Sequence, residues 1–114
     1  PVSYKSSNES SLCVLLQTEN CDIMVLGDAG VQTEQILVQR HALPKLDLLV
    51  VGHHGSRTST GEQLLQQTEP EYAVISVGKD NSYGHPADEV LQRLSSFGCK
   101  ILRTDRNGTV VFRR

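Results

Sequence analysis

Two apolar segments near the beginning of the chain, separated by a short polar step, predict a β-hairpin. Residues 10–18 are rich in leucine, valine and cysteine, and residues 21–26 read Cys-Asp-Ile-Met-Val-Leu. Glu19 and Asn20 lie between the two segments, and a two-residue polar step between apolar runs is typical of a tight turn. We therefore expect two antiparallel strands joined at this turn.

Three later segments have the apolar spacing of amphipathic helices. The spacing predicts helices over residues 32–42, 60–67 and 86–97. In the last of them, Pro86 stands at a first-turn position that suits proline, and Gly98 is a good residue to stop a helix.

Continuous apolar runs predict further strands at residues 46–51, 72–77 and 100–103. The first of these is the kind of run that is buried on both faces of a sheet. An Asn-Gly pair at 107–108 is a strong hairpin signal, so residues 109–112 are expected to form a last strand that pairs with residues 100–103.

The resulting order is β-β-α-β-α-β-α-β-β, which predicts an α/β fold with a mixed sheet. The chain has 114 residues, of which 38% are hydrophobic, so it forms one domain at most and has enough apolar material for a core. In sheets of this kind, functional groups gather in the loops that follow the carboxyl ends of the strands.

Charge and apolar run length exclude some classes of protein. The 11 basic and 13 acidic residues give a formal charge of −2, which excludes a basic grip on nucleic acid over the whole surface but leaves room for a local patch. The longest apolar run, residues 46–51, is far shorter than the roughly 18 residues that cross a bilayer, so no transmembrane segment is expected. Because the chain begins with Pro1, we expect a processed product or a piece of a longer protein.

Four chemically competent side chains directly follow predicted strands. Asp28 follows the second strand, His53 and His54 follow the third, and His85 closes the loop after the fourth. If these strands are parallel, all four residues lie along one edge of the sheet. A carboxylate with two or three imidazoles suits Zn²⁺ or Mn²⁺, ions that polarise a phosphoryl oxygen and lower the pKa of a bound water.

The same residues also have ordinary structural explanations. Asp28 is suited to cap the helix that follows it, and His85 is suited to a plain loop position. The pair His53-His54 favours a function, because two titratable rings directly after a buried strand need partners and Gly55 permits a close approach of the backbone.

The polar loop over residues 56–60 allows two interpretations. Its side chains are hydrogen-bond donors that suit phosphate oxygens. Alternatively, Ser59 or Thr60 caps the next helix. The residues alone favour neither interpretation.

A longer motif carries a family resemblance. Residues 47–59, Asp-Leu-Leu-Val-Val-Gly-His-His-Gly-Ser-Arg-Thr-Ser, resemble the metallo-β-lactamase-like domain of the ComEC family, the DNA-internalisation competence proteins of bacteria. The resemblance continues upstream in residues 8–12 and 25–28. Downstream it continues in residues 73–78, 81–86, 103–105 and 107–108. Together these motifs are specific, and they cover nearly the whole chain in order.

The resemblance implies a fold and a set of roles. The fold is the C-terminal half of a four-layer αββα sandwich, which holds one or two metal ions between two similar halves. Asp28 matches the aspartate that bridges the metals, and His54 matches the last histidine ligand. His53 is implied as their neighbour or as a substrate contact, and His85, in a Gly-His-Pro segment, as a substrate-phosphate contact or proton-transfer group. We therefore expect Asp28 and His54 to be metal ligands and His53 and His85 to be catalytic.

One departure from the family pattern is large. The signature His-x-His-x-Asp-His, which supplies three or four ligands, does not occur in this sequence. Two protein ligands leave most of a coordination shell to water. We therefore expect the divalent metal, Zn²⁺ or Mn²⁺, to be bound in the intact domain but weakly or not at all by this chain, which is expected to be inactive alone.

The function implied by the resemblance is that of a metal-dependent phosphodiesterase or nuclease, which hydrolyses DNA by metal-bound hydroxide in the intact domain of a DNA-uptake protein. Its implied partners are single-stranded DNA and the missing N-terminal half of the domain. Because that half would normally cover one side of the sheet, we expect an uncovered apolar face through which the chain can self-associate. Its implied place is a soluble domain of a bacterial inner-membrane protein. Two alternatives stay open: a hydrolase of the same fold that acts on another phosphodiester, and a non-catalytic DNA-guiding or structural module.

Overall fold

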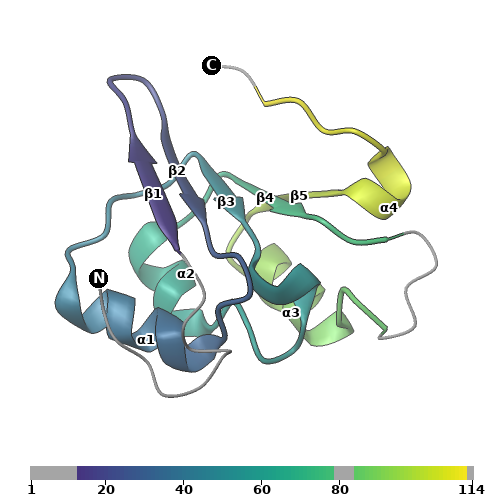
Figure 1. Ribbon diagram of the computed structural model, residues 1–114, viewed down its shortest axis with the longest axis horizontal. Helices are drawn as coiled ribbons and strands as arrows, with labels where there is room; N and C mark the ends of the chain where they lie inside the picture. The colour runs from purple at the N-terminus through teal and green to yellow at the C-terminus, as the bar shows by residue number, and fades with distance from the viewer. Residues whose placement is uncertain (1–12, 79–83, 113–114) are drawn as a thin grey trace.

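A single mixed sheet organises the chain (Figure 1). The computed structural model describes residues 13–78 and 84–112. The sheet has five strands in the order β1-β2-β3-β4-β5, with β1 antiparallel to β2 and the remaining neighbours parallel. Their bounds are β1 (Val14–Gln17), β2 (Asp22–Val25), β3 (Leu48–Val50), β4 (Tyr72–Ile75) and β5 (Lys100–Arg103).

The first hairpin is confirmed. β1 and β2 are joined through a turn in which the Thr18 N–H and hydroxyl both donate to the carbonyl oxygen of Cys21, at 3.0 and 2.9 Å. The Cys21 N–H in turn donates to the Thr18 hydroxyl at 3.0 Å. The turn is therefore closed by its own polar groups, as short polar side chains allow. Residues 10–12 of the predicted first strand lie outside the described residues.

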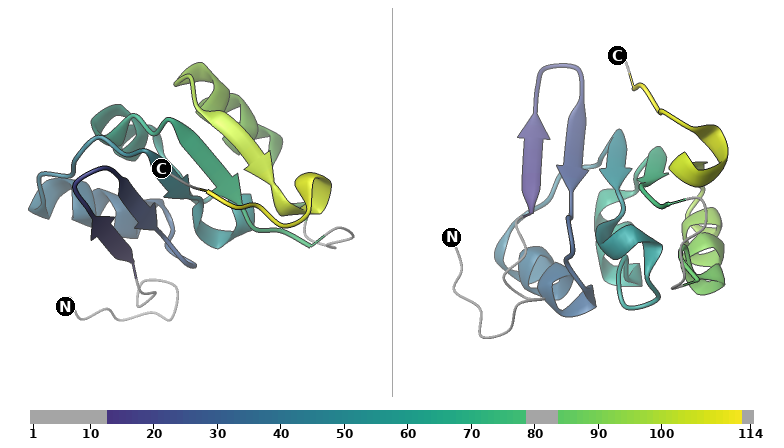
Figure 2. Two further views of the ribbon diagram at one scale, coloured as in Figure 1. Left: turned by 90° about the horizontal axis from the view of Figure 1, so that it is seen from above. Right: turned by 45° about the vertical axis from the view of Figure 1, so that its right-hand side comes forward.

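Three helices connect the parallel strands: α1 (Val31–Arg40), α2 (Glu62–Thr68) and α3 (Asp88–Ser96). Each crosses from one strand to its immediate neighbour in the same direction, and right-handed crossovers then put all three helices on one face of the sheet (Figures 1 and 2). The three predicted helices are confirmed. The predicted role of Pro86 is wrong in detail, because α3 begins at Asp88 and Pro86 lies before it.

The hydrophobic core lies between these helices and the sheet. One row across the sheet faces the helices and consists of Leu15, Met24, Leu49, Ala73 and Ile101. The helices contribute fully buried leucines and a valine, namely Leu64, Leu65, Val90 and Leu94. Each such side chain stabilises the fold by about 1.5–3 kcal/mol through burial, so this face of the sheet fixes the layer arrangement.

The opposite face of the sheet is also apolar. Two rows lie on it: Val14, Val25, Val50, Val74 and Leu102, and then Leu16, Ile23, Leu48 and Tyr72. Leu16 is 53% exposed. Near the end of the described chain, the Phe112 ring packs on Tyr72 with ring centroids 5.5 Å apart. The three helices lie on the other side of the sheet. Among the described residues of this face, Val14 and Leu16 are exposed, Leu48 is buried and the others are half-buried.

The predicted closing hairpin is wrong. The chain turns at the end of β5 into a short helix, α4 (Thr104–Asn107), and the described residues 109–112 contain no strand. The described order is therefore β-β-α-β-α-β-α-β-α, apart from one further single turn before α2, and the last predicted strand is absent from it.

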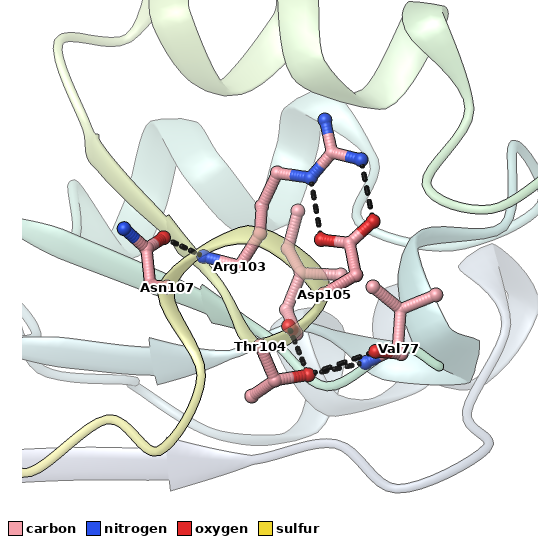
Figure 3. A network of polar contacts seen from close by, with 6 residues as sticks. Val77, Arg103, Thr104, Asp105 and Asn107 are labelled. Atoms are coloured by element: carbon pink, nitrogen blue, oxygen red, sulfur yellow. Dashed lines mark hydrogen bonds and ion pairs between the residues drawn. The ribbon is translucent and has the colours of Figure 1, made fainter. Parts of the chain in front are cut away.

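Local hydrogen bonds explain this difference (Figure 3). The Asn107 side-chain oxygen accepts the Arg103 N–H at 2.8 Å, where a hairpin partner would have bonded. The Thr104 hydroxyl accepts the Val77 N–H at 2.8 Å and donates to the Val77 carbonyl at 3.0 Å, and Arg103 pairs with Asp105 at 2.8 Å. An Asn side chain that satisfies the backbone in this way competes with the hairpin that an Asn-Gly pair otherwise favours.

None of the helices in the described residues combines the length and the apolar character that a membrane crossing requires.

Candidate functional site

Three loops meet at the carboxyl ends of β2, β3 and β4. The parallel pairing of these strands is confirmed, and it brings the loops to one edge of the sheet. The His53 N–H donates to the carbonyl oxygen of Gly27 at 2.7 Å. A Cβ atom at Gly52 would lie 2.7 Å from the Ala29 carbonyl oxygen, so only glycine permits the two loops to approach this closely.

The histidine pair has an unusual backbone. It occupies a single turn, η1 (Gly52–Gly55), in which His53 and His54 have φ angles of 50° and 54°. Non-glycine residues in the left-handed region cost on the order of 1–3 kcal/mol each, and such strain clusters at functional sites. Two consecutive strained histidines therefore point to a site rather than to an ordinary loop.

Asp28 and His53 share a pocket. The pocket has a volume of about 380 Å³, and its lining includes these two residues. The other polar residues of the lining are Gln32 and Thr33, at the beginning of α1, and Thr58, in the loop after η1. The carboxylate and the imidazole thus lie beside the N-terminus of a helix in one cavity of ligand-binding size.

His54 is not among the residues that line this pocket. Its side chain is exposed, and its Nδ1 atom lies 2.6 Å from the carbonyl oxygen of Ser76, just after β4. A carbonyl oxygen can only accept a hydrogen bond, so Nδ1 carries the proton and Nε2 of the neutral ring keeps a free lone pair. Histidines that bind metals are commonly oriented in this way.

His85 lies next to His53. The two ring centroids are 5.8 Å apart in an edge-on arrangement. The approach is fixed by backbone contacts, because the Ala87 N–H donates to the Gly55 carbonyl at 2.8 Å and a Cβ at Gly55 would lie 2.6 Å from the Pro86 Cβ. Partial burial, together with the charges of His53 and His54, lowers the pKa of His85.

The donor chemistry fits a divalent cation, but the number of donors is too small for a complete site. Asp28 offers a carboxylate and His54 an oriented imidazole. In the described parts of the chain, however, no group of three or more His, Cys, Asp or Glu side chains is placed to hold a metal ion. A stable site would need further ligands from elsewhere.

The sequence did not reveal the two side chains, Glu34 and Arg93, that bind the loop after η1. The carboxylate of Glu34, on α1, is 1% exposed and accepts the backbone N–H groups of Thr60 and Gly61, the latter at 2.7 Å. Arg93, on α3, donates to the carbonyl oxygens of Ser59 and Thr60 at 3.3 and 2.9 Å. The loop is thus bound by a buried acid from one helix and a base from another.

Burial dominates the ionisation of Glu34. It raises the pKa of this carboxyl to about 7, against the lowering effect of the two amide hydrogen bonds and of Arg93. Nothing in the sequence distinguishes Glu34 from an ordinary acid in the first turn of a helix, because its partner amides lie 26 and 27 positions away.

The helix-cap interpretation of the polar loop is wrong. α2 is preceded by Gly61, and no side chain caps it. The Ser59 hydroxyl instead donates to the carbonyl oxygens of Gly52 and Ser56, at 2.8 and 2.9 Å, which ties the loop back to η1. Thr58 is the member of the loop that lines the pocket.

Comparison with known proteins adds a family context. No protein-family model matches the chain. ComE operon protein 3 of Bacillus subtilis is 44% identical over 108 residues, which are 95% of this chain and 14% of that protein. Recombination protein 2 of Haemophilus influenzae is 37% identical over 93% of the chain and 13% of its own length. Competence protein ComA of Neisseria gonorrhoeae is 41% identical over 79% of the chain and 13% of its own length. By these similarities the chain belongs to a family of competence proteins.

The chain spans only 13–14% of the length of these relatives. The similarity therefore concerns one segment of each competence relative. The metallo-β-lactamase-like fold, and its division into halves, stay predictions from the sequence motifs.

Gly55→Ala tests the contact that brings His85 to His53. The new Cβ would meet Pro86 at 2.6 Å in a backbone with φ of +79°. We expect a loss of about 3 kcal/mol in the free energy of unfolding, measured by urea denaturation. Gly98→Ala is the matched control, because its φ is +78° and a Cβ there meets no described atom within 4 Å. It should cost only about 1 kcal/mol, and equal losses would show that the Pro86 contact is unimportant.

Glu34→Gln tests the buried carboxyl. Because the pKa of Glu34 in the folded chain is about 7, above its ordinary value near 4.5, the folded state binds more protons between these values. Its stabilising contribution is full below about pH 4.5 and is lost as the pH rises through 7. The stability of the parent chain should therefore fall relative to Glu34→Gln by roughly 3 kcal/mol between pH 4.5 and 8 in urea titrations. The exposed Glu62→Gln is the control, and parallel curves for Glu34→Gln and the parent would contradict the assignment.

Proposed function

We propose that this chain is part of a metal-dependent phosphodiesterase domain in a bacterial inner-membrane protein of DNA uptake, and that the intact domain hydrolyses DNA. The observation that carries the proposal is the meeting of Asp28, His53 and His85 at the carboxyl edge of the parallel strands, with His54 on the same turn as His53. Open α/β sheets bind ligands at this edge.

Asp28 and His54 are the proposed metal ligands. Asp28 supplies a carboxylate in the pocket, and His54 offers Nε2 because the Ser76 carbonyl holds its Nδ1 proton. When bound, a Zn²⁺ or Mn²⁺ ion supplies a hydroxide nucleophile at neutral pH and stabilises negative charge on the phosphate. The remaining ligands are proposed to come from outside this chain, so the chain alone is expected to bind the ion weakly.

His53 and His85 are the proposed catalytic residues. Their rings are in edge contact, and His53 also lines the pocket that contains Asp28. A phosphate in that pocket would lie within reach of His53. We assign His53 to substrate contact and His85 to phosphate contact or proton transfer to the leaving oxygen.

DNA is the favoured substrate because one relative is named for recombination and another for competence. The pocket itself supports only the wider class of phosphodiesters. The alternative substrate is therefore a small phosphodiester. If the intact domain hydrolyses neither, we propose that it is a non-catalytic module that guides DNA.

The experiment is a cleavage assay on the intact domain that contains this chain. A labelled single-stranded oligonucleotide should be cut in the presence of Mn²⁺, and Asp28→Asn and His54→Gln should each slow the cleavage at least about 100-fold. His41→Gln, an exposed histidine outside the site, should leave the rate unchanged. Cleavage of bis(p-nitrophenyl) phosphate without cleavage of DNA would favour the alternative substrate, and cleavage of neither would overturn the enzymatic proposal.

The apolar open face of the sheet is the proposed docking surface for the rest of the domain. It presents nearly complete apolar rows, and Leu16 and Val14 are exposed on it. Covering such rows with a second apolar sheet would remove them from water, which is the arrangement of a sandwich. In the isolated chain we propose that a second copy takes that place.

Sedimentation of the isolated chain tests this surface. We expect a concentration-dependent dimer, and Leu16→Glu should shift it to monomer because a carboxylate would be buried at the interface. Gln17→Glu is the control, since it adds the same charge to the neighbouring, exposed position, whose side chain lies on the other face. A chain that stays monomeric at all concentrations, or a dimer that persists in Leu16→Glu, would contradict the proposal.

A further inference from the structure

The pocket beside Asp28 contains a polar group that nothing in the described chain uses. Thr33 lines this pocket and is 1% exposed. Its hydroxyl oxygen is the one buried side-chain polar atom among the described residues that has no hydrogen-bond partner. Buried hydroxyl groups are nearly always bonded, so an orphaned one next to a cavity indicates a ligand that supplies the missing partner.

The backbone around Thr33 also has N–H groups without acceptors. Thr33 lies in the first turn of the ten-residue helix α1, and Gly30, which precedes the helix, provides no side-chain cap. The Val31 N–H is taken by the Thr58 carbonyl at 2.7 Å. The N–H groups of Gln32 and Thr33 have no acceptor within the helix, by the geometry of any helix N-terminus, and none among the other described residues.

Hydrogen-bond donors of this kind suit an anionic ligand rather than a cation. The Gln32 and Thr33 amides and the Thr33 hydroxyl all belong to the first turn of α1, at the positive end of its dipole, and helix N-termini with unbonded amides bind phosphate in many proteins. Asp28 lines the same pocket and would repel an anion there. His53, on the same wall, and a cation held by Asp28 would offset that repulsion.

We propose that this pocket is a phosphate subsite, in which the Gln32 and Thr33 amides and the Thr33 hydroxyl donate to the non-bridging oxygens of one phosphate group. The pocket volume of about 380 Å³ exceeds what a phosphate alone requires and accommodates the sugar attached to it. This inference rests on the proposed function in one respect only, which is that the phosphate belongs to a DNA strand.

The test is an NMR titration of the 114-residue chain with inorganic phosphate and, separately, with thymidylyl-thymidine, each in the presence of Mg²⁺. The amide resonances of Gln32 and Thr33 should shift and saturate with both ligands, and chloride at equal ionic strength should leave them in place. Shifts confined to other residues, or shifts that chloride reproduces, would overturn the subsite.

Thr33→Val separates binding from folding. The substitution keeps the shape and removes the unpaired hydroxyl, so the thermal midpoint should stay the same or rise. The affinity for phosphate should nevertheless fall at least about ten-fold, which corresponds to the loss of one good hydrogen bond to a charged group. Thr33→Ser should restore most of the affinity, and Thr109→Val, at an exposed position, is the control. A lower thermal midpoint without loss of affinity would show that the hydroxyl is merely structural.

The outcomes for the subsite and for the proposed function are distinguishable. If the intact domain cuts DNA and Thr33→Val leaves KM and kcat unchanged, the subsite is wrong and the function stands. If phosphate shifts Gln32 and Thr33 in the chain while the intact domain cuts no phosphodiester, the subsite stands and the function is wrong.

Discussion

The close approach of the turn η1 to the loops on either side of it is the contact on which the candidate site depends. Gly52 touches the loop that carries Asp28, and Gly55 touches Pro86, next to His85. A Cβ at either glycine would overlap a neighbour at 2.6–2.7 Å. Since the backbones meet without side chains between them, residues from three strand ends come within reach of one another.

A second constraint acts from the helix side of the sheet. Two adjacent buried residues of α1 differ in their hydrogen bonding. Both carboxylate oxygens of Glu34 accept hydrogen bonds from the loop after η1, whereas the hydroxyl of Thr33 has no partner among the described residues. The first residue holds the loop in place, and the loop together with α1 forms the wall of the pocket. Burying the carboxyl of Glu34 costs folding free energy, but its two hydrogen bonds order the loop beside the pocket. Such an exchange of stability for function is common in proteins.

Much of the fold could be predicted from local patterns, and the errors have local causes. The hairpin at Glu19-Asn20 and the three helices follow from apolar spacing, which directly reflects burial. The closing hairpin failed because the Asn107 side chain bonds to Arg103 rather than leaving that amide for a strand. Glu34 and Arg93 could not be identified, because their partners are distant in sequence and are backbone groups, which leave no mark on residue type.

The sequence by itself predicted the alternation of strands and helices up to residue 103 and the positions of Asp28, His53, His54 and His85 directly after strands, because apolar runs depend only on local pattern. Only the tertiary structure decided that His53 shares the pocket with Asp28 while His54 turns to the Ser76 carbonyl. The directions of neighbouring side chains depend on backbone angles, and the left-handed angles of this pair are imposed by contacts of η1 with other segments of the chain.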